Sequence, residues 1–428
     1  MRILRTRNPR DRKTIAELMD REVASAEVAN TVRPIIEDIK RNGDNAVLKY
    51  TRRFDRAKLT ARRLLCTNRE IQAARKLVPN SFLTSVRRIR KNIWGYHKRQ
   101  MPDEWAIDAG LGAKLGEIIR PIQAVGVYVP GGTAPLVSTL LMTVIPAQIA
   151  GVERIAIATP PDSSGEINPY ILATSDFLGV HEIYKMGGAQ AIAAMALGTK
   201  TVSKVDKIVG PGNVYVTEAK RQLFGTVDID SPAGPSEILV LADSTANSEY
   251  IAADILSQAE HGTGEEISLL VTNSEKLAKD VAQEVDKQLT ALGRKEIMAR
   301  VINTGTFAVI AKSMKEAIEI TNSIAAEHLE IITRKPRAIL KQIKNAGAIF
   351  IGNYSPVPVG DYVAGPSHVL PTNGAAKAFS GLSVLDFVKR IGTIEYTKKK
   401  LASVVKDLET IALVEGLDAH AKTARIRL

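Results

Sequence analysis

The sequence predicts an α/β protein with two Rossmann-like, doubly wound parallel-sheet domains, a helical N-terminal segment and a helical C-terminal tail. From Ala124 onward, short β-branched runs alternate with alanine-rich helical segments. Most of these runs begin 25 to 30 residues apart, which is the length of one βα unit. Four of the runs lead into glycine-rich turns, as strands do at the ligand-binding edge of a parallel sheet. Together these observations favour parallel sheets covered by helices.

The first hundred residues are expected to be helical. One apolar helical face consists of Val28, Val32, Ile35, Ile36 and Ile39, and a second consists of Phe82, Val86, Ile89 and Ile93. Gly43 follows the first face and is a typical helix end. Pro34 lies inside that face, so the helix either starts near it or kinks there.

Nine strands are expected in the rest of the chain. They begin near Ala124, Arg154, Glu182, Lys207, Glu237, Ile267, Phe307, Leu329 and Ala348. Residues 353–376 form a long loop with four prolines and three glycines, and its polar residues favour a functional role. The tail that follows is expected to be helical, with an apolar stripe formed by Leu401, Val404, Val405, Leu408 and Ile411.

We expect four parts along the chain. Residues 1–22 form the N-terminal helical segment. Residues 23–127 and 237–381 form the first Rossmann-like domain, which carries most of a metal site. Residues 128–236 form the second Rossmann-like domain, which carries the glycine-rich turns. Residues 382–428 form the helical tail, which is too small to be stable alone and must dock on another surface.

Composition argues against several classes of protein. No apolar run approaches the about 18 residues that a membrane span needs. Residues 1–12 lack the apolar core of a secretory signal, so we expect a cytoplasmic protein with no membrane partner. Cys66 is the only cysteine, which excludes an intramolecular disulfide and a thiolate metal cluster. Any metal must therefore be held by nitrogen and oxygen ligands.

The net charge of +12 raises the alternative of a non-catalytic nucleic-acid-binding protein. Its distribution argues against that alternative: residues 1–100 carry 26 Lys+Arg against 10 Asp+Glu, and the rest of the chain is nearly neutral. Only 5% of the residues are aromatic, which is few for a base-stacking platform. We therefore expect a solvated basic face and no specific nucleic-acid partner; a binding titration against salt would distinguish the two.

The glycine-rich turns suggest a ligand-binding edge. They span residues 128–132, 186–190, 210–213 and 232–236. Strand-to-helix turns of a parallel sheet share one edge, where backbone N–H groups at helix N-termini face anions. Gln190 and Asn213 stand where a side-chain amide could reach a ligand. A single such turn usually serves only helix–strand packing, and no G-x-G-x-x-G fingerprint is present, so the residues alone indicate a nucleotide-sized ligand and no more.

A second set of residues has the composition of a metal site. Gln258 and His261 are spaced i, i+3, so they share a face of a helix that Gly262 would end. Asp361 lies in the long loop, and Glu415 and His420 flank the end of the last helix. Nitrogen and oxygen donors of this kind suit Zn²⁺, with Mn²⁺ or Co²⁺ as substitutes. The alternative for each histidine is an ordinary solvated helix cap.

Glu327 and His328 form an adjacent acid and base. Neighbours on a regular strand point to opposite faces, so the two can serve one site only at a strand end or a bend. The alternative is an alternating edge strand with His328 inside and Glu327 in water.

These segments, taken in order, resemble the signatures of the histidinol dehydrogenase family. The resemblance is carried by residues 128–136, 187–199, 210–221, 231–237, 257–262, 327–329, 361–372 and 415–420. It runs from the first long helix to the C-terminus. One departure is Ala326, where the family usually has a proline before the Glu-His pair.

The resemblance implies a role for each matching residue. One Zn²⁺ per site would be held by Gln258, His261, Asp361 and His420, and NAD would contact Tyr128, Gln190 and Asn213. The catalytic residues would be Glu327 and His328. Substrate would contact Ser236, Gln258, His261, His328, Asp361, His368, Glu415 and His420. The family also implies an intertwined homodimer in which the tail completes the partner's site, so Glu415 and His420 would act in trans.

The implied reaction is the NAD-dependent oxidation of L-histidinol through L-histidinal to L-histidine, the last steps of histidine biosynthesis. The nearest alternative is a zinc- and NAD-dependent relative that oxidises another amino or sulfonated polyol. Glu415 argues against a sulfonate, because its carboxylate would repel that group and attract a cationic amine.

Overall fold

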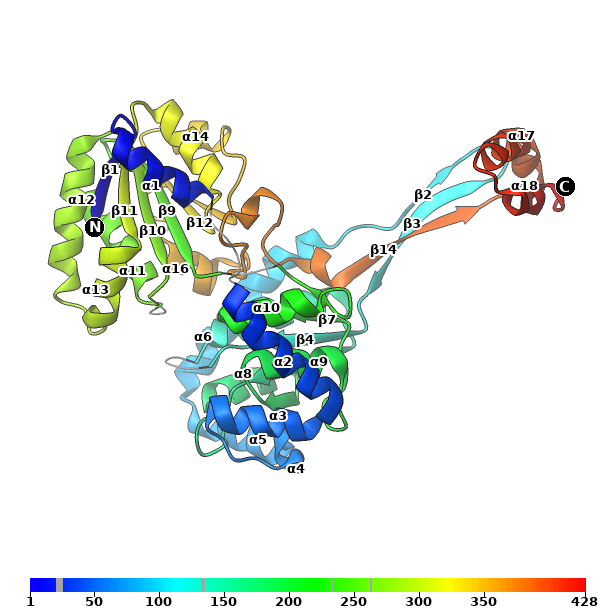
Figure 1. Ribbon diagram of the computed structural model, residues 1–428, viewed down its shortest axis with the longest axis horizontal. Helices are drawn as coiled ribbons and strands as arrows, with labels where there is room; N and C mark the ends of the chain where they lie inside the picture. Colours follow the sequence, from blue (N-terminus) through cyan, green and yellow to red (C-terminus); the bar gives the residue numbers. More distant parts are fainter. Residues whose placement is uncertain (21–25, 132–134, 232–233, 262–263) are drawn as a thin grey trace.

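The computed structural model describes residues 1–20, 26–131, 135–231, 234–261 and 264–428. Two α/β domains lie side by side, and a narrow arm extends from them to the C-terminal helices (Figure 1). Among the described residues no helix is both long and apolar enough to cross a membrane.

The first domain is built on a six-stranded parallel sheet in the order β1-β11-β10-β9-β12-β13. Its strands are β1 (Arg2–Arg5), β9 (Glu237–Ala242), β10 (Ile267–Thr272), β11 (Thr306–Ile310), β12 (His328–Ile332) and β13 (Ala348–Ile351). The chain enters the middle of the sheet at β9, winds outward through β10 and β11, and returns to β12 on the other side of β9. This is the doubly wound topology that the sequence predicts, with its switch point between β9 and β12.

Helices cover both faces of this sheet. Apolar side chains of α11 (Ser248–Ala259), α12 (Glu275–Leu289) and α13 (Lys295–Thr304) pack on one face. Those of α1 (Pro9–Met19) and α14 (Met314–Ile324) pack on the other.

The second domain is built on a five-stranded parallel sheet in the order β6-β5-β4-β7-β8. Its strands are β4 (Ala124–Tyr128), β5 (Arg154–Thr159), β6 (Glu182–Lys185), β7 (Lys207–Val209) and β8 (Asp228–Ile229). The crossover helices are α7 (Val137–Ala150), α8 (Pro169–Leu178), α9 (Gly188–Leu197) and α10 (Val214–Leu223). The order around β4 repeats the order around β9, so the two sheets share one winding scheme.

The early helices belong to this second domain. They are α2 (Ala26–Asn42), α3 (Asp44–Tyr50), α4 (Ala61–Leu64), α5 (Asn68–Leu77) and α6 (Asn80–His97), with a π-helical turn over Thr51–Asp55 and a 3₁₀ turn over Lys98–Gln100. Side chains of α2 and α3 pack against one face of the five-stranded sheet, and those of α5 and α6 pack against the other. Helix α2 runs through Pro34 and ends before Gly43, which has a positive φ of 49°. Of the two alternatives at Pro34, a helix start is therefore wrong, whereas the expected helix end at Gly43 is confirmed.

A three-stranded antiparallel sheet forms the arm. Strand β3 (Lys114–Pro121) lies between β2 (Trp105–Asp108) and β14 (Val388–Glu395), and β3 and β14 pair along eight residues. The arm carries α17 (Lys398–Val414) and α18 (Asp418–Arg425) at its tip, far from both domains (Figure 1). The tail from residue 382 is therefore not wholly helical, because its first part is the strand β14.

The observed elements change the expected division of the chain at two places. Residues 26–127 supply no strand to the six-stranded sheet; their helices and β4 belong to the five-stranded sheet. The N-terminal segment is not wholly helical, since β1 adds to the six-stranded sheet by pairing in parallel with β11. The nine expected strands all form, each within one residue of its expected start. Residues 353–376 contain short turns, including α16 (Val357–Val359), η3 (Gly360–Ala364) and η4 (Ala375–Lys377).

Candidate active site

The Glu-His pair lies at the amino end of β12, beside the amino end of β9. Ala325 ends helix α14 in the left-handed conformation, with φ of 51°, and turns the chain into the strand. Glu327 precedes the strand, and His328 is its first residue and pairs with Ile238 of β9. Glu327 and His328 are 6% and 4% exposed. The strand-end arrangement is therefore confirmed, and the alternative with Glu327 in water is wrong.

The Glu327 carboxylate is enclosed by protein. Its Oε2 accepts a hydrogen bond from the backbone N–H of Glu237 at 2.8 Å and lies 3.6 Å from Nδ1 of His328. Burial raises the pKa of Glu327 to about 8, although the neighbouring His328 opposes the rise. A carboxyl group whose pKa lies near neutrality can exchange a proton during turnover.

His328 is held by the backbone of the neighbouring strand. Its Nδ1 lies 2.9 Å from the carbonyl oxygen of Glu237, and its Nε2 lies 3.6 Å from Oδ1 of Asp361. Burial lowers the pKa of His328, but the carboxylates of Glu327 and Asp361 outweigh burial and raise that pKa to about 9.

Three imidazoles lie near Asp361 and influence its carboxylate. Burial raises its pKa, but His328, His368 and His261 outweigh burial and hold the pKa below its usual value. His368 directs Nδ1 at the main-chain carbonyl oxygen of Asp361, 3.0 Å away. Desolvation lowers the pKa values of His261 and His368, and the Asp361 carboxylate opposes both changes. The predicted neighbours His261, His328, Asp361 and His368 are thus brought together.

Gln258 and His261 approach this group from helix α11. Gln258 is 1% exposed, and its buried Nε2 has no hydrogen-bond partner in the described parts of the chain. His261 follows the helix end, with its backbone N–H bonded to the carbonyl oxygen of Gln258 at 3.3 Å. Its side chain is reachable by solvent. Gly262, the expected end of the helix, lies outside the described residues.

The donors around Asp361 fit a zinc ion in type, although they do not form a closed site. Turning over the unpartnered Gln258 amide would present its oxygen, and imidazole nitrogen with carboxylate oxygen completes a zinc-like set. No three His, Cys, Asp or Glu side chains in the described ranges converge closely enough to hold a metal alone.

The remaining predicted ligands, Glu415 and His420, are not part of this cluster. Glu415 caps α17 and His420 lies on α18, and both are exposed at the tip of the arm (Figure 1). Ser236, in contrast, lies at the start of β9, next to Glu237, and is half-buried. The chain thus brings Ser236 to the same sheet edge as His328 but keeps its own tail away.

The cluster lies where the two domains meet. The η3 turn that carries Asp361 packs against α6 of the other domain, and the Asn92 side chain donates a hydrogen bond to the carbonyl oxygen of Val363 at 2.7 Å. Three of the four glycine-rich turns lie at the carboxyl edge of the five-stranded sheet. The fourth follows β8, which is parallel to β7, so it starts at the same edge, but it leads into β9 of the other sheet and not into a helix. Residues 132–134 and 232–233 of these turns lie outside the described residues.

The three predicted cofactor-binding side chains sit in these turns. The Tyr128 hydroxyl accepts a hydrogen bond from the N–H of Gly188 at 3.0 Å. Gln190 is fully buried, donates to Asp55 at 3.3 Å, and keeps its Oε1 without a hydrogen-bond partner in the described ranges. Asn213 is exposed and caps α10 by accepting from the N–H groups of Tyr215 and Val216.

The structure adds two acidic residues that the sequence reasoning missed. Glu237 is buried; its Oε1 accepts from the N–H of Asn373 at 2.8 Å, and its Oε2 lies 3.4 Å from the N–H of Glu327. Asp55 accepts from the N–H of Gly187 at 3.1 Å, and burial raises its pKa to about 6. Glu237 could have been identified from the sequence, because it is a charged residue at the start of the apolar run 237–242. No local sequence feature identifies Asp55 as a buried residue of the site.

Comparison with known proteins agrees with this arrangement. The family model described as histidinol dehydrogenase matches residues 18–428. The chain belongs to the histidinol dehydrogenase family. It is 50% identical over 404 residues to a histidinol dehydrogenase of Listeria innocua, which covers 94% of each chain. It is 47% identical over 403 residues to that of Clostridium acetobutylicum, which covers 94% of this chain and 93% of that one.

The fold agrees with that of a solved family member. The crystal structure of histidinol dehydrogenase from Elizabethkingia anophelis superposes with a TM-score of 0.93 at 40% identity. The match covers 100% of this chain and 98% of that one, so the arm and the helices at its tip are included.

Proposed function

We propose that this family member catalyses the NAD-dependent, four-electron oxidation of L-histidinol through L-histidinal to L-histidine. The observation that carries the proposal is the group of three imidazoles around Asp361, next to the buried pair Glu327 and His328. The names of the curated relatives support the same reaction.

The chain would hold Zn²⁺ through Gln258, His261 and Asp361, with His420 supplied by a second subunit. When bound, the ion would gather the imidazole and amine of the substrate and orient the carbinol carbon. NAD, when bound near Tyr128, Gln190 and Asn213, would accept a hydride in each oxidation step.

His328 is suited to accept the protons of both oxidations. Its Nδ1 faces a carbonyl oxygen, so in the neutral ring that atom carries the hydrogen and Nε2 is free to take the substrate hydroxyl proton. Because the pKa of His328 is about 9, the neutral ring is the minor form at neutral pH and becomes the major form above about pH 9. The first oxidation removes that proton and a hydride from the carbinol carbon and leaves the aldehyde.

Glu327 is suited to the hydration that must follow. As a carboxylate it would take a proton from water while the water oxygen bonds to the aldehyde carbon. The aldehyde oxygen would take the proton that His328 gained in the first oxidation, which gives the hydrate and leaves His328 neutral for the second oxidation. A second removal of a hydroxyl proton and a hydride from that carbon gives the acid. Enclosure of Glu327 keeps the reactive aldehyde in a site with little bulk water.

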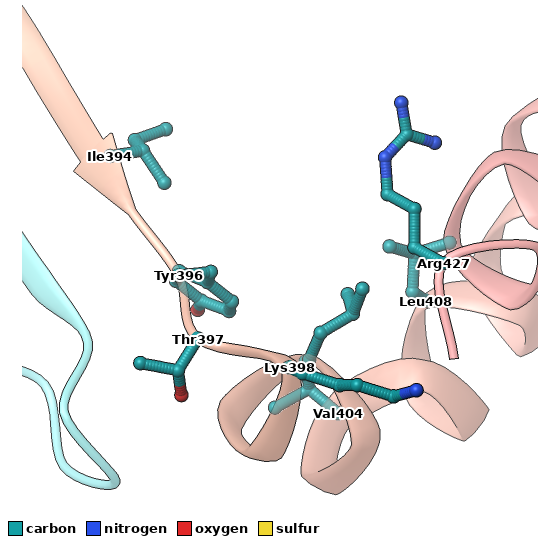
Figure 2. Close-up of a pocket in the computed structure, with 8 residues that line it drawn as sticks. Ile394, Tyr396, Thr397, Lys398, Val404, Leu408 and Arg427 are labelled. Carbon is teal, nitrogen blue, oxygen red and sulfur yellow. The ribbon is translucent and has the colours of Figure 1, made fainter.

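We further propose that the arm of one subunit completes the site of another in a homodimer. The helices at the arm tip expose apolar side chains, among them Val414 at 82% and Ile426 at 70%. Figure 2 shows a hollow beside them, where Leu408 and Val404 face Tyr396 and Ile394. A monomer would leave these surfaces in water, and a stable dimer would cover them. Glu415 and His420, exposed on the same helices, would then reach the partner's Asp361 cluster.

The test is NADH production from L-histidinol by metal-analysed protein. We expect two NADH per histidinol consumed, one zinc per subunit, and loss of activity with a chelator. L-Histidinal should be accepted as a substrate. Turnover of a sulfonated or other amino polyol, with none of histidinol, would instead identify a relative with a different substrate.

A further inference from the structure

Two buried carboxyl groups that the proposed reaction does not use lie together beneath the site. Asp254, on α11, is 8% exposed, and Glu330, on β12, is 1% exposed. Their side chains are hydrogen-bonded to each other. Removing two acids from water costs several kcal/mol per ionised group unless they are neutralised or paired, so the pair calls for a physical explanation.

The hydrogen-bond geometry indicates one shared proton. Glu330 Oε1 accepts from the backbone N–H of Val357 at 3.0 Å, while its buried Oε2 meets no donor in the described chain. An ionised carboxylate has no hydrogen to donate, so two carboxyl groups bond to each other only when one is protonated. Burial raises the pKa of Asp254 to about 6 and that of Glu330 well above its usual value. Because Oε1 is occupied by Val357, Oε2 is the oxygen of Glu330 that remains to carry a shared proton toward Asp254.

This hydrogen bond connects the elements that carry the site. Asp254 lies one helical turn before Gln258 on α11. Glu330 lies two residues after His328 on β12. Val357, held by the same carboxyl group, lies four residues before Asp361. Three elements that converge on the metal cluster are therefore joined through one carboxyl group and its proton.

We propose that Asp254 and Glu330 are positioning residues that share one proton and hold α11, β12 and the Val357 turn at the spacing that zinc binding requires. This inference rests on the zinc site of the proposed function. Residues that hold metal ligands in position commonly contribute about 10- to 100-fold to metal affinity, so the effect should be measurable with zinc alone.

Two substitutions at Glu330 test whether the residue acts through its shared proton or only by filling space in the core. In Glu330→Gln, the amide oxygen can accept from Val357 and the amide N–H can donate to Asp254, as the protonated acid does. In Glu330→Leu, the shape is kept but both hydrogen bonds are lost. The control is Glu218→Leu, which removes another carboxylate, 1% exposed, from α10 in the other domain.

The readouts are zinc affinity, by competition with a chelator, and hydrogen exchange of the segment around Val357 in the purified dimer. Glu330→Gln should match the wild type within about twofold in both. Glu330→Leu should bind zinc about 10-fold more weakly or worse and exchange faster at Val357, whereas Glu218→Leu should do neither. Wild-type behaviour of Glu330→Leu, or equal damage by Gln and Leu, would overturn the proposal. If the wild type bound no zinc, the proposed metal site would fail, and exchange at Val357 would still decide the role of the pair.

Discussion

Nδ1 of His328 lies 2.9 Å from the main-chain carbonyl oxygen of Glu237. A carbonyl oxygen can only accept, so Nδ1 carries the hydrogen, and Nε2, on the side of Asp361, is the atom that takes a proton. The contact follows from the parallel register of β12 beside β9, in which His328 pairs with Ile238. The sheet backbone, and not a second carboxylate, therefore orients the base.

The roles assigned to Glu327 and His328 predict that substitutions can affect the two oxidation steps separately. Glu327→Gln should still interconvert histidinol and histidinal but lose the conversion of histidinal to histidine by about 100-fold or more, because the amide cannot accept a proton from water. His328→Asn should impair both steps, since each removes a proton from oxygen. The measurement is NADH formation with each substrate separately. Equal loss of both steps in Glu327→Gln would contradict the role assigned to Glu327.

The metal should follow the residues around Asp361. Alanine at His261 or Asp361 should abolish tight zinc binding and leave the unfolding midpoint of the metal-free protein nearly unchanged. Both sheets have complete apolar cores of their own, unlike a zinc finger, so folding does not need the ion. Zinc content after gel filtration measures the effect. Stoichiometric zinc in either variant would show that the ligand assignment is wrong.

Asp55 should make stability depend on pH. Its pKa in the folded protein is about 6, above the usual aspartate value of 3.8, because burial disfavours the charged form. The folded state therefore holds the proton more tightly, and the associated stability, full below about pH 4, is lost as the pH rises through 6. Asp55→Asn removes the charge and should stabilise the protein at pH 8 by about 1–3 kcal/mol, at about 1.4 kcal/mol per pKa unit.

Denaturant unfolding from pH 4 to pH 8 measures this difference between Asp55→Asn and the wild type. The difference in unfolding free energy between the two proteins should disappear toward pH 4, where both side chains are neutral in the folded state. A gap of the same size at pH 4 and pH 8 would show that the charge of Asp55 is not its cause.

The alternation of strands and helices was predictable because buried parallel strands read as continuous apolar runs, such as Glu237–Ala242. The arm was not predictable from the same signal. Strands β2 and β14 are largely exposed, and their side chains lack a clean apolar alternation. Strand β1 is only four residues long, too short to distinguish from the start of a helix.

The candidate site shows the same contrast. Local patterns identified Glu327 and His328 as neighbours that require a strand end, and Ala325 supplies that bend even though Ala326 replaces the usual proline. Glu237 and Asp55 act through contacts with residues 90 and 135 positions away, and no local spacing reveals such contacts. Glu327 and His328 also lie at the amino end of their sheet, whereas the general rule for α/β folds places ligands at the carboxyl end.

The last prediction concerns the arm. Asp361 lies on the η3 turn, which packs against α6, whereas His420 is exposed on α18 at the arm tip, so one chain does not bring these two residues together (Figure 1). If the arm completes a partner's site, His261→Asn and His420→Asn homodimers should each be inactive. Mixed dimers should regain activity, because one of their two sites collects both substitutions and the other collects none.

The fraction of mixed dimers determines how much activity should return. Random reassortment of equal amounts gives about half mixed dimers, each with one intact site, so activity should reach about one quarter of the wild type. Subunits must be dissociated and reassembled together, and mass spectrometry should confirm the mixed species. A mixture of His261→Asn with Asp361→Asn is the matched control: both residues come from the same cluster, so each site in its mixed dimers carries one substitution and activity stays lost. Mixed His261→Asn/His420→Asn dimers that are confirmed by mass and remain inactive would show that each site is built within one chain.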